Sequence, residues 1–221
     1  MTVALISDVH ANKPALEAVM DDLPDVDGYV HAGDAVGYNP YPQDCVDALR
    51  ELGAVNVQGN HDRAVAGDAS FGFHSTAGRA VEWTERHVNG ETLDWLGALP
   101  QERETVFGDT RVKIVHGAPG APDRYTYPRD FAPSLLRDED VLVMGHTHVQ
   151  GKEEYDKGVV VNPGGVGQPR DGDPRAAYAL LDEETGEVEL HRVEYPVEEV
   201  QDEIRRAGLP ESLAERLEEG R

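Results

Sequence analysis

The sequence predicts a mixed α/β fold in which two β-sheets pack face to face, with helices on their outer faces. In the first half of the chain, short apolar runs alternate with amphipathic segments, a pattern typical of parallel strands joined by helices. In the second half, apolar runs follow one another across short turns, a pattern typical of antiparallel hairpins. Both patterns in one chain indicate two packed sheets.

The first half begins as β-α-β-α-β. The expected strands cover residues 2–7, 28–34 and 54–62, and the expected helices between them cover residues 11–23 and 43–52. In the first helix, apolar side chains recur at helical spacing from Leu16 to Leu23. Residues 74–99 predict two further amphipathic helices, which divide near Asn89 and Gly90.

The second half predicts mainly strands. A hairpin is expected over residues 103–117, because Gly108 and Asp109 form a favourable turn pair between two apolar runs. The remaining elements are a buried strand at residues 140–148 and hairpins at residues 151–165 and 175–195.

The whole chain, residues 1–221, is interpreted as one domain with a helical tail at about residues 197–221. No low-complexity tract or linker divides it. Apolar residues from Val197 to Ile204 recur at helical spacing, and a second short helix is expected near Pro210. We expect this tail to cover the outside of the core rather than to recruit a partner.

The charge is strongly acidic. Asp and Glu total 43 against 20 Lys and Arg, which gives a formal net charge of −23. Because this excess is larger than solubility requires, we interpret it as a halophilic adaptation to a cytoplasm of high salt, where the Debye length is about 3 Å at 1 M. An ordinary well-solvated surface is the alternative. Neither surface offers the basic footprint that long nucleic acid requires.

The N-terminus lacks the features of a signal peptide, since it has no basic start and Asp8 interrupts its apolar run. No stretch approaches the length of a membrane-spanning helix. The single cysteine, Cys45, excludes an intrachain disulfide and is expected in the core. We therefore expect a soluble, cytoplasmic protein with no membrane partner, either a monomer or an oligomer.

Polar side chains follow five of the expected strands at the point where each strand ends. The five segments are Asp8-Val9-His10, Gly33-Asp34, Gly59-Asn60-His61-Asp62, His116-Gly117 and Gly145-His146-Thr147-His148. Because ligand sites of open α/β sheets lie at the carboxyl ends of strands, we expect the five segments to meet at one site. In the Asp-x-His and His-x-His pairs, alternate residues of an extended segment would face the same side, with Thr147 facing away.

Imidazole, carboxylate and amide groups together suit divalent metals such as Mn, Fe, Zn, Ni or Co. Nine such side chains are too many for a single ion, but they suit two ions about 3.5–4 Å apart with one bridging carboxylate. Four other histidines have no such partner at short spacing and are expected to be structural, namely His31, His74, His87 and His191.

The motif series SDVH, AGD, GNHD, VHG and GHTH, in this order, resembles that of the calcineurin-like metallophosphoesterase superfamily. Three longer stretches resemble its small prokaryotic phosphodiesterase/phosphatase branch: SDVHANKPALEAV, GDAVGYNPYPQDCVDAL and VNPGGVGQPRDGDPRAAYALLD. The resemblance extends to about Tyr195.

This resemblance implies a four-layer αββα sandwich, two mixed β-sheets flanked by helices, and a site with two divalent ions, of which Mn is favoured over Fe, Zn, Ni and Co. The implied ligands are Asp8, His10 and His148 for one ion, and Asn60, His116 and His146 for the other, with Asp34 bridging. His61 would contact the substrate, and Asp62 would orient His61.

The implied activity is the hydrolysis of phosphomonoesters or phosphodiesters in a small phosphorylated substrate. A metal-bridging hydroxide would attack phosphorus, and His61 would protonate the leaving oxygen as general acid. Two alternatives stay open. One is a nucleotide hydrolase that cleaves cyclic nucleotides, dinucleoside polyphosphates or nucleic acid. The other is a non-catalytic scaffold, as in the retromer subunit that resembles this family.

Two departures from the family pattern concern the substrate. Gly165 stands where relatives commonly carry serine in an NPGS loop, so any substrate contact of this loop would rest on backbone N–H groups. The arginine-rich GDxxDRG element of protein Ser/Thr phosphatases is absent. Tyr38 and Asn39 either line a substrate pocket or form a Pro-bounded turn. Arg170 either contacts phosphate or pairs with a neighbouring aspartate.

Overall fold

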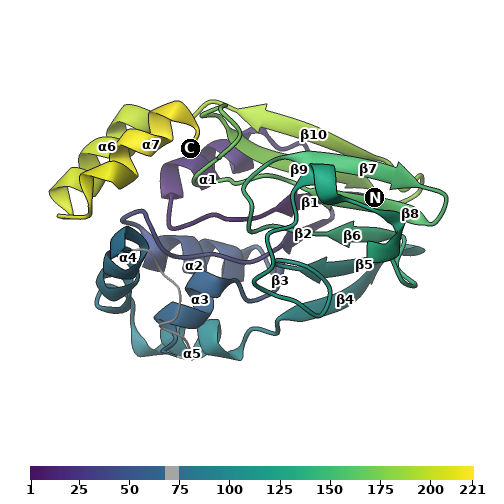
Figure 1. Ribbon diagram of the computed structural model, residues 1–221, viewed down its shortest axis with the longest axis horizontal. Helices are drawn as coiled ribbons and strands as arrows, with labels where there is room; N and C mark the ends of the chain where they lie inside the picture. Colours follow the sequence, from purple (N-terminus) through teal and green to yellow (C-terminus); the bar gives the residue numbers. More distant parts are fainter. Residues whose placement is uncertain (68–74) are drawn as a thin grey trace.

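The computed structural model describes residues 1–67 and 75–221, and it contains two five-stranded β-sheets (Figure 1). The first sheet has the order β10-β9-β1-β2-β3, and the second has the order β4-β5-β6-β8-β7. The strands of the first sheet are β1 (Thr2–Ile6), β2 (Gly28–His31), β3 (Val55–Asn56), β9 (Ala176–Asp182) and β10 (Val188–Val193). Those of the second are β4 (Glu102–Phe107), β5 (Thr110–Val115), β6 (Val141–Val143), β7 (Gly151–Tyr155) and β8 (Gly158–Asn162).

Both sheets are mixed, as the sequence predicts. Strands β1, β2 and β3 run parallel, joined by α1 (Lys13–Asp22) and α2 (Pro42–Glu51), and β9 joins β1 antiparallel. In the second sheet β5, β6 and β8 run parallel. The three expected hairpins are confirmed as β4–β5, β7–β8 and β9–β10.

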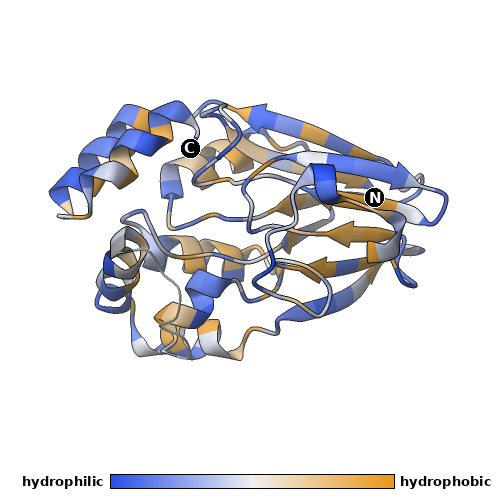
Figure 2. Ribbon diagram, viewed as in Figure 1, coloured by the Kyte–Doolittle hydropathy of each residue, from blue (hydrophilic) through white to orange (hydrophobic). Residues whose placement is uncertain are grey.

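The inner faces of the two sheets form one apolar core. Val3, Leu5 and Val30 of the first sheet pack in the same cluster as Ile114 and Val143 of the second, all without solvent exposure. Figure 2 shows that the edge strands β4 and β7 are largely hydrophilic, whereas the central strands are apolar. This arrangement buries β1, β2, β5 and β6, whose carboxyl ends carry the polar segments of interest.

Helices cover the outer face of the first sheet. The C-terminal helices α6 (Val197–Arg206) and α7 (Glu211–Glu219) lie side by side and contribute Ile204 and Leu217 to the same core cluster as α1 and α2 (Figure 1). The tail therefore covers the core, as expected. The outer face of the second sheet is covered by a shorter segment, which contains two 3-10 helices, η1 (Pro128–Asp130) and η2 (Pro133–Leu135). Phe131 and Leu136, which follow these helices, pack against this sheet.

The predicted helices after residue 74 are present within the described residues as α4 (Ser75–Glu85) and α5 (Gly90–Ala98). Asn89 is the N-cap of α5, because its side-chain oxygen accepts a hydrogen bond from the Thr92 N–H at 2.8 Å. His74 lies outside the described residues.

Three strands are shorter than predicted, because the motif residues leave the sheet. The strand expected to reach residue 34 ends at His31, and the one expected to reach residue 148 ends at Val143. The third, β3, has two residues, and a short helix, α3 (Asn60–Val65), begins within the predicted strand.

Candidate metal centre

The loops that follow β1, β2, β5 and β6 meet the start of α3 at the carboxyl ends of the central strands. Together they carry all seven expected metal ligands, which are Asp8, His10, Asp34, Asn60, His116, His146 and His148. All of these side chains are buried except that of Asn60, which is half-buried. The structure thus brings together residues that lie up to 140 positions apart, as the topology of the sheets predicts.

The first group of ligands consists of Asp8, His10 and His148. The Nε2 atoms of His10 and His148 lie 3.1 Å apart, and the Oδ1 atom of Asp8 lies 3.2 Å from the Nε2 atom of His148. This Oδ1 atom is buried and has no hydrogen-bond partner among the described residues. A carboxylate oxygen without a donor, beside two imidazole nitrogens, fits a bound cation.

The second group consists of Asn60, His116 and His146, with Asp34 beside them. The Nε2 atom of His116 lies 3.1 Å from the Oδ1 atom of Asn60, 3.2 Å from the Nδ1 atom of His146 and 3.3 Å from the Oδ2 atom of Asp34. These donor atoms are the nitrogen and oxygen ligands that borderline divalent metals accept.

Asp34 stands between the two groups. Its Oδ2 atom lies 3.5 Å from the Nε2 atom of His10 in the first group and 3.3 Å from that of His116 in the second. Its Oδ1 atom accepts a hydrogen bond from the His61 N–H at 2.8 Å, which fixes the carboxylate in this position. One oxygen within reach of both groups is the geometry that a bridging ligand requires.

Backbone carbonyls determine which ring nitrogen of each histidine faces the site. The Nδ1 atoms of His10, His116 and His148 lie 3.0, 2.7 and 2.5 Å from the carbonyl oxygens of Val36, Ala32 and Gln168. A carbonyl only accepts, so each Nδ1 carries a proton, and in the neutral ring Nε2 then keeps its lone pair for a metal. His146 has the opposite arrangement, since its Nε2 atom lies 3.2 Å from the carbonyl oxygen of Asp123.

Five ligands adopt left-handed backbone conformations. Their φ angles are 53° at Asp8, 46° at His10, 59° at Asp34, 68° at His146 and 56° at His148. The expectation of an extended segment with alternating side chains is therefore wrong: each pair reaches one site through two left-handed turns. Non-glycine residues in this region cost on the order of 1–2 kcal/mol each, and such strain is concentrated at functional sites.

Burial dominates the electrostatics of the histidines. It lowers the pKa of His10 and His148 well below the usual value, and it lowers the pKa of His146 to about 3. Burial also lowers the pKa of His116, but the negative charge of Asp34 outweighs it and raises this pKa to about 10. Most of the cluster is thus kept neutral, which is the form of imidazole that binds a metal.

A sequence model described as the calcineurin-like phosphoesterase superfamily domain matches residues 1–186. The chain belongs to this superfamily. The match includes all seven ligand positions, so the ligand cluster is part of the family domain.

Proteins similar to this chain match it over most or all of its length. An uncharacterized protein of Methanocaldococcus jannaschii is 35% identical, over 99% of this chain and 98% of its own length. A probable metallophosphoesterase of Methanothermobacter thermautotrophicus is 30% identical, over 89% of this chain and 95% of its own length. The crystal structure of a metallophosphoesterase from Sphaerobacter thermophilus matches with a TM-score of 0.84 at 38% identity, over 100% of this chain and 99% of that chain. Among the described residues, no helix is long and apolar enough to cross a membrane.

In this member of the superfamily, Asp62 accepts hydrogen bonds from the backbone beside the ligand groups. Its Oδ2 atom accepts hydrogen bonds from the N–H groups of Asp34 and Gly59, each at 2.9 Å, and its Oδ1 atom accepts one from Val36 at 3.3 Å. That Asp62 orients His61 stays a prediction. The three hydrogen bonds of its carboxylate join the loop after β2 to the start of α3.

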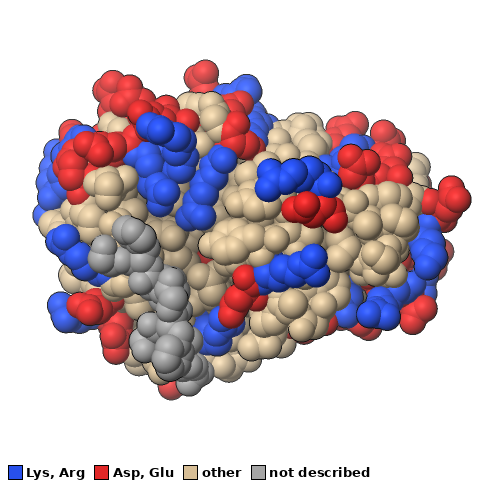
Figure 3. Space-filling model, in the orientation of Figure 1, with Lys and Arg blue, Asp and Glu red and all other residues tan. Residues whose placement is uncertain are grey.

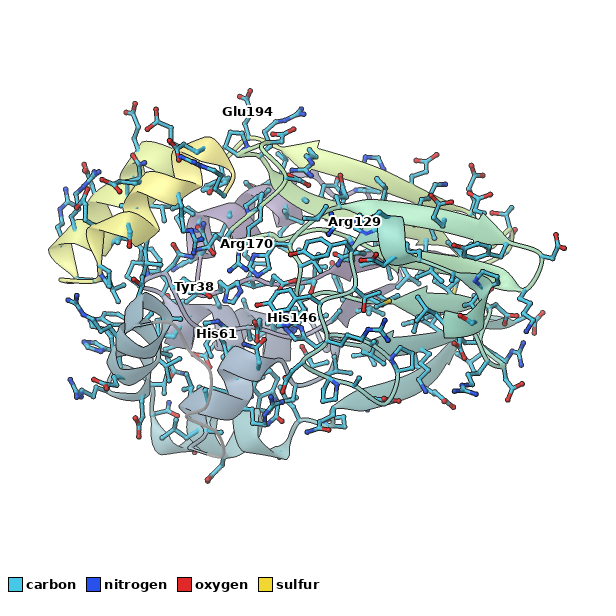
Figure 4. All side chains as sticks on the ribbon, viewed as in Figure 1. Tyr38, His61, Arg129, His146, Arg170 and Glu194 are labelled. Atoms are coloured by element: carbon cyan, nitrogen blue, oxygen red, sulfur yellow. The ribbon has the colours of Figure 1, made fainter. Side chains whose placement is uncertain are left out.

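Tyr38 and Arg170 lie beside the ligand groups, and their contact with substrate stays a prediction, whereas Asn39 is buried. The ring of Tyr38 is centred 4.5 Å from that of His10 and 4.4 Å from that of His61. The guanidinium carbon of Arg170 lies 5.5 Å from the centre of the Tyr38 ring (Figure 4). Asn39 is 1% exposed, and its Nδ2 atom donates to the carbonyl of His10 at 2.8 Å. Asn39 therefore supports the His10 loop.

The loop that contains Gly165 supports the first ligand segment. The N–H groups of Val166 and Gly167 donate to the carbonyls of Ser7 and Asp8, at 3.0 and 2.9 Å. These two N–H groups are therefore already used within the protein.

Several residues around the site give no signal in the sequence. The ring of Tyr125 is centred 4.0 Å from that of His146 and is half-exposed at the edge of the site. Asp123 and Gln168 act through backbone carbonyls, which every residue type has, so only the fold could reveal them. The histidines expected to be structural lie outside the ligand groups within the described residues; His31, for example, contacts Asn56.

Proposed function

We propose that the protein is a dinuclear-metal phosphoesterase that hydrolyses phosphomonoesters or phosphodiesters. The observation that carries this proposal is the position of Asp34, whose single oxygen lies 3.5 Å from His10 and 3.3 Å from His116, in different ligand groups. Asp8, His10 and His148 would hold one ion, and Asn60, His116 and His146 the other. The family resemblance makes Mn our first choice, with Fe, Zn, Ni and Co as alternatives, since imidazole, carboxylate and amide donors accept each of these ions.

Two divalent ions held by these residues would lower the pKa of bound water and would neutralise charge on phosphoryl oxygens. The protein positions the side chains that would bind the two ions. Carbonyl hydrogen bonds direct the lone pairs of His10, His116 and His148 toward the site, and Asp62 fixes the backbone that carries Asp34. The surrounding burial excludes water and strengthens every electrostatic interaction in the site.

His61 is the proposed general acid. Its backbone N–H is fixed by Asp34, and its ring, 3% exposed, lies edge-on to His10 with ring centres 4.8 Å apart. Burial lowers its pKa to about 4. A bound phosphoryl dianion would raise this pKa again, since an adjacent negative charge favours the imidazolium. His61 would then donate its proton to the leaving oxygen.

The test is hydrolysis of p-nitrophenyl phosphate and bis(p-nitrophenyl) phosphate by protein loaded with Mn, Ni, Co or Zn. We expect His61→Ala to keep its metal content and to lose at least about 100-fold in turnover, the usual contribution of a general acid. His87→Ala is the matched control, because His87 is exposed and stacks on Trp83. A metal-replete wild type that is inert with all four ions would instead support a scaffold.

A further inference from the structure

A cleft of about 550 Å³ opens beside the proposed metal centre, between α4 and α7. Tyr38 and Arg170 line its inner end, Thr76 and Ala77 line it from α4, and Arg216 lines it from α7. Figure 3 shows basic side chains along the hollow beside the α6–α7 hairpin, on a surface that is otherwise rich in acidic groups. The C-terminal helix thus contributes to the surroundings of the site as well as to the core.

Two guanidinium groups in this cleft are held by one neutral oxygen. The Oε1 atom of Gln168 accepts hydrogen bonds from Nη2 and Nε of Arg170, at 2.8 and 3.2 Å, and from Nη1 of Arg216 at 3.3 Å. Both guanidinium carbons lie over the ring of Tyr38, at 5.5 and 6.0 Å from its centre. That ring also contacts His10, so the two arginines are close neighbours of the first ligand group.

Neither arginine has a carboxylate partner. Among the described residues, no ion pair includes Arg170 or Arg216, whereas Arg175 pairs with Asp173 and Arg192 pairs with Asp171. Glu215 and Glu219 also line the cleft, but both are exposed and neither lies within ion-pair distance of the two arginines. In a chain with 43 acidic and 20 basic residues, two neighbouring cations without a carboxylate partner need an explanation.

The close approach of the Arg170 and Arg216 guanidinium groups is electrostatically unfavourable. Arg216 is about half buried, and burial together with the positive charge of Arg170 lowers its pKa. The side chain of Gln168 beneath them is fully buried, and its Nε2 atom has no hydrogen-bond partner within the described residues. An anion between the guanidinium groups would offset their repulsion, and phosphate oxygens match the planar donor pattern of arginine.

We propose that Arg170 and Arg216 form a subsite for a second phosphate group of the substrate, distinct from the phosphoryl group that is cleaved. This inference rests on the proposed phosphoesterase function and narrows its substrate class to phosphoesters that carry a further phosphate. The subsite binds and orients; it takes no part in breaking the ester bond.

The test uses two substrates that differ by one phosphate: thymidine 5′-(p-nitrophenyl phosphate) and its 3′-phosphorylated derivative. Both release p-nitrophenolate, so leaving group and readout are identical. We expect the wild type to prefer the 3′-phosphorylated substrate by at least about tenfold in kcat/KM, the effect of one charge-assisted hydrogen bond. Arg216→Gln should remove the preference, mainly through KM.

Arg205→Gln is the matched control, because Arg205 is exposed on the adjacent helix α6 and pairs with Glu211. This variant should keep both the wild-type rate and the wild-type preference at the same ionic strength. A wild type without preference, or an Arg216→Gln variant that keeps it, would overturn the subsite.

Failure of the proposed activity is separable from failure of the subsite. If neither diester is cleaved, calorimetry compares the dissociation constants of thymidine 3′,5′-bisphosphate and thymidine 5′-monophosphate. The subsite predicts at least about tenfold tighter binding of the bisphosphate by wild type and by Arg205→Gln, and near-equal binding of the two nucleotides by Arg216→Gln. Near-equal binding of the two nucleotides by wild type would refute it.

Discussion

His146 and His148 present opposite ring nitrogens to the two ligand groups. The carbonyl of Gln168 holds the Nδ1 proton of His148, whereas the carbonyl of Asp123 holds the Nε2 proton of His146. Two histidines separated by one residue can therefore serve different ions. Thr147 between them points toward β8, where its Oγ1 atom accepts a hydrogen bond from Asn162 at 3.0 Å.

This division predicts that each histidine controls the affinity for one ion. We expect His146→Ala and His148→Ala each to retain about half of the wild-type metal content after dialysis, measured by inductively coupled plasma mass spectrometry. Thr147→Ser is the control and should retain all of it, because it keeps the hydroxyl that accepts from Asn162. Full metal content in either alanine variant would contradict the assignment.

Replacing Asp62 should destabilise the fold as well as the site. Asp62→Asn removes the charge that three backbone N–H groups share and leaves at least one buried donor unsatisfied, so we expect a loss of about 3 kcal/mol in the free energy of unfolding. Urea denaturation of both proteins measures it. Asp94→Asn, at an exposed position of α5, should change this free energy by less than about 0.5 kcal/mol.

His31 should make stability depend on pH. Burial, and next the positive charge of His116, lower its pKa to about 4, whereas an unfolded histidine titrates near 6.5. Between these values the unfolded chain binds a proton that the folded chain does not, so stability falls as pH falls. Relative to His31→Gln, the wild type should lose about 2 kcal/mol between pH 7 and pH 5, measured by urea denaturation. A difference independent of pH would contradict this origin.

The acidic surface predicts a dependence on salt. With a net charge of −23, self-repulsion at low ionic strength should lower the midpoint of thermal unfolding, and multimolar KCl should raise it by screening. Calorimetric scans from 0.1 to 3 M KCl measure the shift, with an equal osmolality of sucrose as the control. A midpoint that is already maximal without added salt would exclude the halophilic interpretation.

The sequence was informative where side-chain chemistry and chain order coincide. Asp8, Asp34 and His116 follow apolar strands, so their meeting at one edge could be predicted from the topology of parallel strands. The local backbone could not, because the apolar runs that predict β2 and β6 say nothing about where φ turns positive. This is why both strands were predicted too long.

The cleft could not be predicted from the sequence, for a different reason. Gln168, Arg170 and Arg216 come from a loop and the last helix, and the pattern of α7 predicts only which of its faces is apolar. Whether a surface arginine pairs with a carboxylate depends on tertiary distances. Whether Arg170 pairs with a neighbouring aspartate could therefore be seen only in the structure, where Arg175 pairs with Asp173 and Arg170 has no ion pair among the described residues.

The left-handed ligand residues have a consequence for metal binding. Their conformations are held by contacts within the protein: the N–H groups of Asp8 and His10 donate to the carbonyls of Gly33 and Asp34, at 3.0 and 2.9 Å. The N–H of His146 donates to the carboxylate of Asp8 at 3.0 Å. The unfavourable backbone geometry is therefore compensated when the chain folds. We therefore expect that an arriving ion would need little rearrangement of the polypeptide, and that selection among metals would depend on donor chemistry and dehydration rather than on induced fit.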